Sequence, residues 1–262
     1  LYRCFPSYLA LSKQEDPMIK LEMCCASAAD VVNAFKGGAD RVELNSAIAY
    51  GGLTPSIADL EIVKAKTNIP VIVMIRPRSG GFSYSELEFE VMKRQAELAI
   101  KYGADGLVFG ILQENRELDL RRNKILKEIA GDKETVFHRA FDIVPDPFAA
   151  LDKIKKIEMD RVLTSAQVNK VADNLQLAKE IIKYAGDQLE IVLGGGIREH
   201  NLKEIIEKTN CKDVHLSAFS NKVDQSMLKQ NLKFNKPCIS ETEYQLIDIQ
   251  KVKRVKEILN NY

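Results

Sequence analysis

The sequence predicts an α/β fold, a single (β/α)8 TIM barrel followed by a C-terminal strand and helix. Eight short β-rich runs alternate with stretches long enough for one helix each, which is typical of a parallel sheet. The runs are apolar throughout, as expected when both faces of each strand are buried in a closed barrel. The 262 residues are close to the roughly 250 of a typical single barrel.

An internal repeat indicates where the strands begin. Asp40, Asp105, Asp160 and Asp213 recur at nearly regular spacing, each just before or at the start of a β-rich run. These runs are the expected second, fourth, sixth and eighth strands. The other four strands are expected at 20–24, 71–76, 135–142 and 190–194.

The segments between the strands carry helix signals. Ser27 can cap a helix over 28–35, with Gly37 or Gly38 as its stop. Apolar residues at helical spacing between 87 and 100 predict a second helix. The same spacing predicts helices over 175–184 and 201–208. A doubly wound open sheet is the alternative. It would usually show G-x-G-x-x-G after the first strand, where this chain has no glycine at 23–27.

The chain divides into three parts. Residues 1–17 are expected to lie outside the fold, because Met18 directly precedes the first regular segment. The barrel is expected at 18–220, and an appendage packed on the barrel at 221–262. Within the appendage, 239–248 is β-like and 249–259 predicts an amphipathic basic helix, whose charges indicate a solvated face rather than a binding patch.

The composition argues against nucleic acid and membranes as binding partners. Lys and Arg number 38 against 37 Asp and Glu, a formal net charge of +1, which argues against a broad footprint for nucleic acid or anionic lipid. No apolar run approaches the ~18–20 residues that span a bilayer. Five scattered cysteines without C-x-x-C favour reduced thiols and a cytoplasmic location. A small ligand or a metal ion is the expected partner.

Ionisable residues near the strand ends are the candidate catalytic groups. The carboxyl ends of the strands carry the chemistry in such barrels, and alternation decides which side chains share a face. The fifth strand should align His138 with Asp142 and leave Arg139 on the other face. Glu22 or Glu43 beside Arg76 would stay ionised, while a second, more desolvated carboxylate would move toward neutrality. The alternative is a buried ion-pair network without chemistry. The candidates are Glu22, Glu43, Arg76, His138, Asp142 and His215.

Two further kinds of site are suggested. Gly194, Gly195 and Gly196 precede a helix, and with Ser217 they could hold a phosphate or carboxylate, although a tight turn alone would explain three glycines. Cys24 is expected to face the barrel interior, with Met74 two strands away. Cu(I) prefers thiolate and thioether ligands, but simple packing also explains a lone inward cysteine.

Several runs closely resemble the CutC family, usually labelled copper homeostasis proteins. These runs are LEMCC (21–25), GADRVEL (38–44), GGLTPS (51–56), IRPR (75–78), DGLVFG (105–110), FHRAFD (137–142) and RVLTS (161–165). The resemblance extends from about residue 21 to 217, and EYQL (243–246) is similar to the tail of longer members. It implies a cytoplasmic TIM barrel, commonly a homo-oligomer (a dimer or larger), that is associated by name with copper.

The resemblance also suggests a copper site. Similar members are those in which cysteines inside the barrel were proposed to bind copper. Cys24 is one of these positions, whereas Asn45 stands where relatives often have a second cysteine. Two functions follow as expectations: binding or handling of copper as Cu(I), with Met74 or a histidine assisting Cys24, or acid/base catalysis on a small anionic or phosphorylated substrate at the barrel mouth. An interaction protein using the basic tail is a third, weaker expectation.

Overall fold

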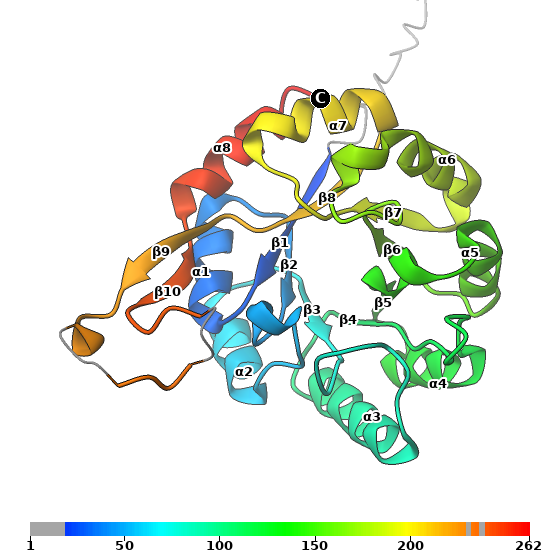
Figure 1. Cartoon of the computed structure of the whole chain (residues 1–262), viewed down its shortest axis with the longest axis horizontal. Coiled ribbons are helices and arrows are strands. Elements are labelled where there is room, and N and C mark those ends of the chain that lie inside the picture. The colour runs from blue at the N-terminus through cyan, green and yellow to red at the C-terminus, as the bar shows by residue number, and fades with distance from the viewer. Residues whose placement is uncertain (1–18, 229–231, 236–238) are drawn as a thin grey trace, which may run out of the picture.

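The computed structural model describes residues 19–228, 232–235 and 239–262. Eight parallel strands, paired in sequence order, close into a barrel with the helices outside (Figure 1). The strands are β1 (Lys20–Cys25), β2 (Arg41–Leu44), β3 (Val71–Met74), β4 (Gly106–Phe109), β5 (Glu134–Phe137), β6 (Arg161–Thr164), β7 (Glu190–Leu193) and β8 (Asp213–Leu216). The predicted (β/α)8 barrel is therefore confirmed. The segment 1–17, expected to lie outside the fold, is not among the described residues.

Eight α-helices surround the barrel, and capping explains where they begin. A Ser, Asp or Asn side chain accepts a hydrogen bond at the start of each of them except α7. Ser27 caps the first helix, as predicted. The helices are α1 (Ala28–Gly37), α2 (Ile57–Lys66), α3 (Glu86–Lys101), α4 (Leu120–Ala130), α5 (Pro147–Lys156), α6 (Leu175–Ala185), α7 (Glu199–Thr209) and α8 (Ile249–Leu259).

The repeated aspartates have a shared structural role. Asp40, Asp105 and Asp160 each accept a hydrogen bond from a backbone N–H at the start of the preceding odd-numbered strand, at 2.7–2.8 Å. Each also pairs with a lysine. Asp213 differs, because its side chain is buried inside the barrel. Three members of the repeat therefore connect neighbouring strands at the N-terminal end of the barrel. The side chain of the fourth lies inside the barrel.

The C-terminal segment adds a hairpin and completes the ring of helices. Strands β9 (Phe219–Val223) and β10 (Glu243–Ile247) pair antiparallel and project to one side (Figure 1). Helix α8 packs against α1 and α7 and thus takes the eighth helix position. A Cβ at Gly37 would lie 2.5 Å from Cβ of Val252, so this glycine allows α8 to approach α1 closely.

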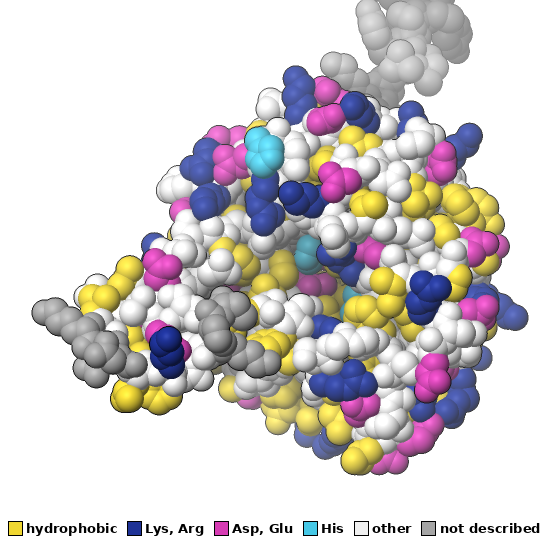
Figure 2. All heavy atoms as spheres, viewed as in Figure 1, with side chains coloured by type: hydrophobic (Ala, Val, Ile, Leu, Met, Phe, Trp, Pro, Cys, Tyr) yellow, Lys and Arg dark blue, Asp and Glu magenta, His cyan; other side chains and the backbone are white. Residues whose placement is uncertain are grey.

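The barrel interior has an apolar side and a polar side. The apolar side comes from β3 to β7 and consists of Ile72, Met74, Val108, Val136, Leu163 and Val192. The polar side comes mainly from β1, β2 and β8. Figure 2 shows a hollow in the middle of the face with acidic, basic and histidine side chains in it. In the described part of the chain, no helix is both long and apolar enough to cross a membrane.

The fifth strand is much shorter than predicted, whereas β3 and β7 end only one or two residues early. β5 ends at Phe137, and a 3-10 helix over Arg139–Ile143 follows it. The turn begins at His138, whose Nδ1 accepts a hydrogen bond from the backbone N–H of Ala140 at 3.2 Å. The expectation of a strand over 135–142, and of side chains alternating along it, is therefore wrong beyond His138.

Candidate metal site inside the barrel

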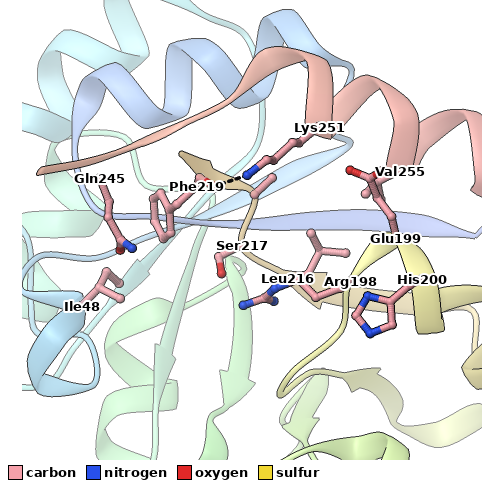
Figure 3. Close-up of a pocket in the computed structure, with 11 residues that line it drawn as sticks. Ile48, Arg198, Glu199, His200, Leu216, Ser217, Phe219, Gln245, Lys251 and Val255 are labelled. Atoms are coloured by element: carbon pink, nitrogen blue, oxygen red, sulfur yellow. Dashed lines mark hydrogen bonds between the residues drawn. The ribbon is translucent and has the colours of Figure 1, made fainter. Parts of the chain in front are cut away.

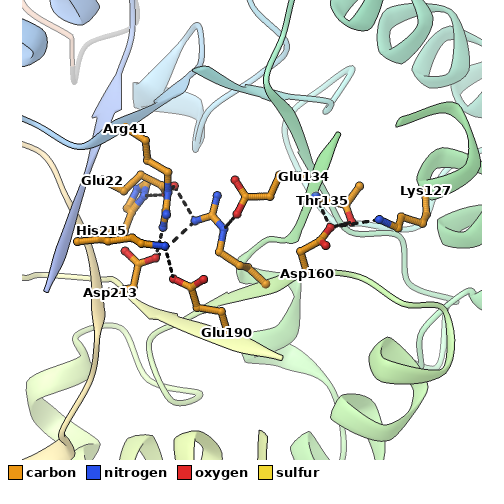
Figure 4. Close-up of polar contacts among 11 residues, drawn as sticks. Glu22, Arg41, Lys127, Glu134, Thr135, Asp160, Glu190, Asp213 and His215 are labelled. Atoms are coloured by element: carbon orange, nitrogen blue, oxygen red, sulfur yellow. Dashed lines mark hydrogen bonds and ion pairs between the residues drawn. The ribbon is translucent and has the colours of Figure 1, made fainter. Parts of the chain in front are cut away.

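Glu22 is the centre of a buried ion network (Figure 4). Its carboxylate accepts hydrogen bonds from Nε of Arg41 at 2.5 Å and from Arg161 at 2.8 Å. The other carboxylate oxygen lies 2.8 Å from Nδ1 of His215. Arg41 also pairs with Asp213 on β8. All five side chains are buried, so the strands β1, β2, β6 and β8 are tied together across the barrel.

The network fixes the charge of Glu22. Burial alone would raise the pKa of this carboxyl group, but the guanidinium groups of Arg161 and Arg41 outweigh burial. The pKa of Glu22 therefore lies well below its ordinary value. The pKa of Asp213 is instead raised well above its ordinary value, because burial prevails over the attraction of Arg41. Glu22 is thus a permanent carboxylate at neutral pH.

Three potential metal ligands lie at this network, and one of them, His215, is part of it. Cys24, Glu43 and His215 each offer a ligand atom, and these atoms all lie within 4.8 Å of one another. The strand register explains the grouping, because Cys24 on β1 is level with Glu43 on β2, and Glu22 is level with His215 on β8. Glu43 and His215 are buried, and Cys24 is partly exposed. A thiolate, a carboxylate and an imidazole can together bind a transition metal ion.

Hydrogen bonds hold the three ligands in place. Glu22 occupies Nδ1 of His215, which leaves Nε2 for a metal, as is usual for histidine ligands. The amide nitrogen of Asn45 donates to Oε1 of Glu43 at 2.7 Å and lies 3.7 Å from Sγ of Cys24. Asn45 therefore contacts two of the three ligands.

Burial and neighbouring charges shift the pKa values of all three ligands. Burial raises the pKa of the Cys24 thiol, against the effect of a hydrogen bond with His215. Burial also raises the pKa of Glu43. For His215, burial favours the neutral ring, but Glu43 and the hydrogen-bonding partners outweigh it and raise its pKa well above the ordinary value. A metal ion would have to displace these protons.

Arg76 does not lie where the sequence predicts. It was expected beside Glu22 or Glu43, but Arg41 and Arg161 take that place. The NH1 of Arg76 donates to the carbonyl oxygens at positions 50, 51 and 52, and its NH2 donates to that of Gly80. Its guanidinium therefore joins the loops that follow β2 and β3.

The expected alignment of His138 with Asp142 is also wrong. Asp142 accepts hydrogen bonds from Oγ1 of Thr164 at 2.5 Å and from the backbone N–H of Ser165 at 2.9 Å. It also pairs with Arg139 at 2.7 Å, so Arg139 is on the same side rather than the opposite one. Asp142 thus fastens the loop after β6, and His138 lies apart from it.

The glycine run is explained by close packing. Gly195 and Gly196 have φ of 86° and 70°, which favours glycine. A Cβ on Gly195 would lie 2.7 Å from Cβ of Ser165, and a Cβ on Gly196 would lie 2.9 Å from Cγ of Lys170. A Cβ on Gly194 would similarly meet the β6 side chain at 163. A tight turn accounts for Gly195 and Gly196, and close packing against β6 accounts for Gly194. An anion-binding role stays a prediction.

Ser217 lines a cavity of about 590 Å³ at the end of β8, beside the start of α7 and α8 (Figure 3). Arg198 and Lys251 also line this cavity. Nζ of Lys251 donates to the carbonyl oxygen of Phe219 at 2.7 Å. β8 is followed by β9, so the short helix that completes many barrel phosphate sites is absent from the described residues there.

Sequence reasoning missed three charged residues of the network, Arg41, Arg161 and Asp213, as members of the site. Asn45 was singled out only as the position of a cysteine in relatives. Strand alternation was a usable signal, because Arg41 is two residues before Glu43 and Asp213 is two residues before His215. Cys24 was predicted to face the interior and lies there beside Glu43 and His215, whereas the adjacent Cys25 is fully buried.

Comparison with known proteins gives one consistent family. The model of the CutC family matches residues 19–220. The human copper homeostasis protein cutC homolog is 41% identical over 92% of this chain and 89% of its own length. A family protein CutC of Treponema denticola is 43% identical over 79% of this chain and 85% of its own length.

Solved structures agree. A crystal structure of the copper homeostasis protein CutC of Streptococcus agalactiae has a TM-score of 0.72 and 32% sequence identity, and the match covers 76% of this chain and 98% of that one. Thiamine phosphate pyrophosphorylase of Pyrococcus furiosus matches with a TM-score of 0.57 at 13% identity. That second likeness shows the barrel fold alone.

Proposed function

Because the chain belongs to the CutC family, we propose that it handles copper by binding one copper ion inside the barrel. The ligands are Cys24, Glu43 and His215. The observation that carries the proposal is their convergence within 4.8 Å of one another from three adjacent strands. The human relative and the Streptococcus agalactiae structure both bear the name copper homeostasis protein.

The three ligands differ in their preference for the oxidation states of copper. A thiolate favours Cu(I), an imidazole accepts either oxidation state, and a carboxylate is the hardest of the three ligands. Asn45 occupies the position at which a second thiolate would adjoin Cys24. The site therefore offers mixed ligands and one sulfur atom, and the Glu22 carboxylate orients the imidazole of His215.

We also propose that the protein acts in the cytoplasm as a homo-oligomer. Support for the compartment comes from the free thiols of Cys24, Cys25 and Cys211, which a reducing environment preserves. Exposed apolar side chains on the projecting hairpin segment, such as Phe234 and Tyr244, support association. A monomer in sedimentation velocity at micromolar concentration would contradict the second part.

Replacing Cys24 by serine should weaken Cu(I) binding by at least about 100-fold, more than the 10–100-fold typical of losing a group that only orients a ligand. Removal of the thiolate leaves one imidazole and one carboxylate, which hold Cu(I) poorly. The measurement is a titration against a chromogenic Cu(I) chelator under reducing, anaerobic conditions. The wild-type protein should bind one equivalent at this site.

The matched control is Cys211→Ala, which removes a buried thiol that is remote in sequence and belongs to the apolar core. Its affinity for Cu(I) should equal that of the wild type. Equal stoichiometry and affinity in the wild type and in Cys24→Ser would eliminate Cys24 as a ligand.

A further inference from the structure

Arg76 is a buried cation without an anionic partner. Its side chain is 5% exposed, and its NH1 and NH2 groups donate to backbone carbonyl oxygens at 2.8–3.1 Å. Across the described ranges, no carboxylate forms an ion pair with it, unlike Arg41 and Arg161 in the same barrel. Buried charges are normally paired, because an uncompensated charge is costly.

His138 is a buried hydrogen-bond donor without an acceptor. Nδ1 accepts from the backbone N–H of Ala140, so the neutral ring carries its proton on Nε2. That Nε2 has no partner among the residues that the structure describes, although the residue is only 4% exposed. Burial, followed by the nearby charge of Arg76, lowers the pKa of His138 to about 3. The ring is therefore neutral, and its N–H remains unsatisfied.

Both of these groups contact the same aromatic ring. The Phe82 ring is 4.9 Å from the His138 ring, and Cζ of Arg76 is 5.1 Å from its centroid. A Cβ on Gly110 would lie 2.5 Å from Nδ1 of His138, so the glycine makes room for the imidazole. Val136, two residues earlier on β5, belongs to the interior apolar cluster, which places His138 on the interior face of the barrel.

An open cavity adjoins this pair of groups. It has a volume of about 620 Å³, and Arg76, Phe82, Arg139 and Gln167 are among the residues that line it. The acidic groups on its wall are Asp142, which is paired with Arg139, and an exposed aspartate at position 173. Arg76 therefore lies in the wall of the cavity, and His138, which is not itself a lining residue, packs against the lining residue Phe82.

We propose that this part of the barrel mouth binds a small oxyanion, the class shared by carboxylates and phosphates. Its negative charge faces Arg76 and Arg139, and one of its oxygens accepts a hydrogen bond from Nε2 of His138. The site is separate from Cys24, Glu43 and His215, and it does not depend on the copper proposal. An anion supplies the two partners that the protein itself lacks here.

The test uses inorganic phosphate and, separately, malonate as probes, with metals removed by a chelator. Calorimetric titration of the wild type should show one equivalent of at least one probe bound, and which probe binds identifies the head group. His138→Phe keeps an aromatic ring but removes the donor, and should weaken binding at least about tenfold, as for a lost hydrogen bond to a charged group. His200→Phe, at an exposed histidine on α7, should leave binding unchanged.

A second measurement covers the case in which His138→Phe folds poorly. In the wild type, the Nε2–H resonance of His138 should shift on addition of the bound probe. Failure of both probes to bind in large excess, or binding that leaves this resonance and the His138→Phe affinity unchanged, overturns the proposal. Cu(I) titration of the same variants reports separately on the copper site, which His138→Phe should leave intact.

Discussion

Replacing Arg161 by methionine should lower the free energy of unfolding by about 3–5 kcal/mol, the usual cost of removing one partner from a buried ion pair. Arg161 is fully buried and pairs with Glu22, Glu134 and Asp213. Methionine fills much of the volume but leaves Glu22 with one fewer positive neighbour in the core. Chemical denaturation at pH 7 measures the change.

Two further variants test whether the loss of stability in Arg161→Met comes from the buried ion pairs. Lys208→Met removes an exposed helix pair with Glu204 and should cost less than about 1 kcal/mol. The double variant Arg161→Met with Glu22→Gln should be more stable than the sum of the two single changes, because the uncompensated carboxylate is then gone. A loss below about 1 kcal/mol in Arg161→Met would show that the network contributes little to stability.

Acidification should destabilise the protein through His138. The pKa of its ring is about 3 in the folded state, against an ordinary value of 6.5, so the unfolded chain binds the extra proton between these values. Stability from the neutral ring is therefore fully present above pH 6.5 and is lost as the pH falls toward 3. Each pH unit in this window amounts to about 1.4 kcal/mol, which is about 3 kcal/mol by pH 4.

Comparison with His138→Phe isolates this contribution from the other titrating groups. The variant should lose less stability than the wild type between pH 7 and pH 4, measured by urea unfolding at several pH values. Parallel stability curves for the two proteins would show that His138 is protonated, or exposed to water, in the folded state.

The barrel was predictable because its signals are local. Strand runs and caps such as Ser27 depend on residues near one another in the chain. The aspartates that bind the start of the preceding strand were visible as a regular repeat. Alternation along each strand also placed Cys24, Glu43 and His215 toward the interior. That rule works because successive side chains on a strand point to opposite faces.

The wrong predictions concern the level of a side chain along the barrel axis and the point at which a strand ends. Alternation gives the face of a residue but not its level in the barrel, which depends on the stagger between strands. Arg76 lies at the level of the loops, whereas Arg41 and Arg161 lie at the level of Glu22. Asp142 was misplaced because the backbone turns at His138, where a hydrogen bond to the histidine ring starts a 3-10 helix.

The most direct test of the copper site is an X-ray absorption spectrum of the copper-loaded protein. One sulfur scatterer and at least two nitrogen or oxygen scatterers are expected, from Cys24, His215 and Glu43. In Asn45→Cys the number of sulfur scatterers should rise to two, because position 45 adjoins Cys24. A wild-type spectrum without sulfur, or an unchanged spectrum in Asn45→Cys, would contradict copper binding at this position in the barrel.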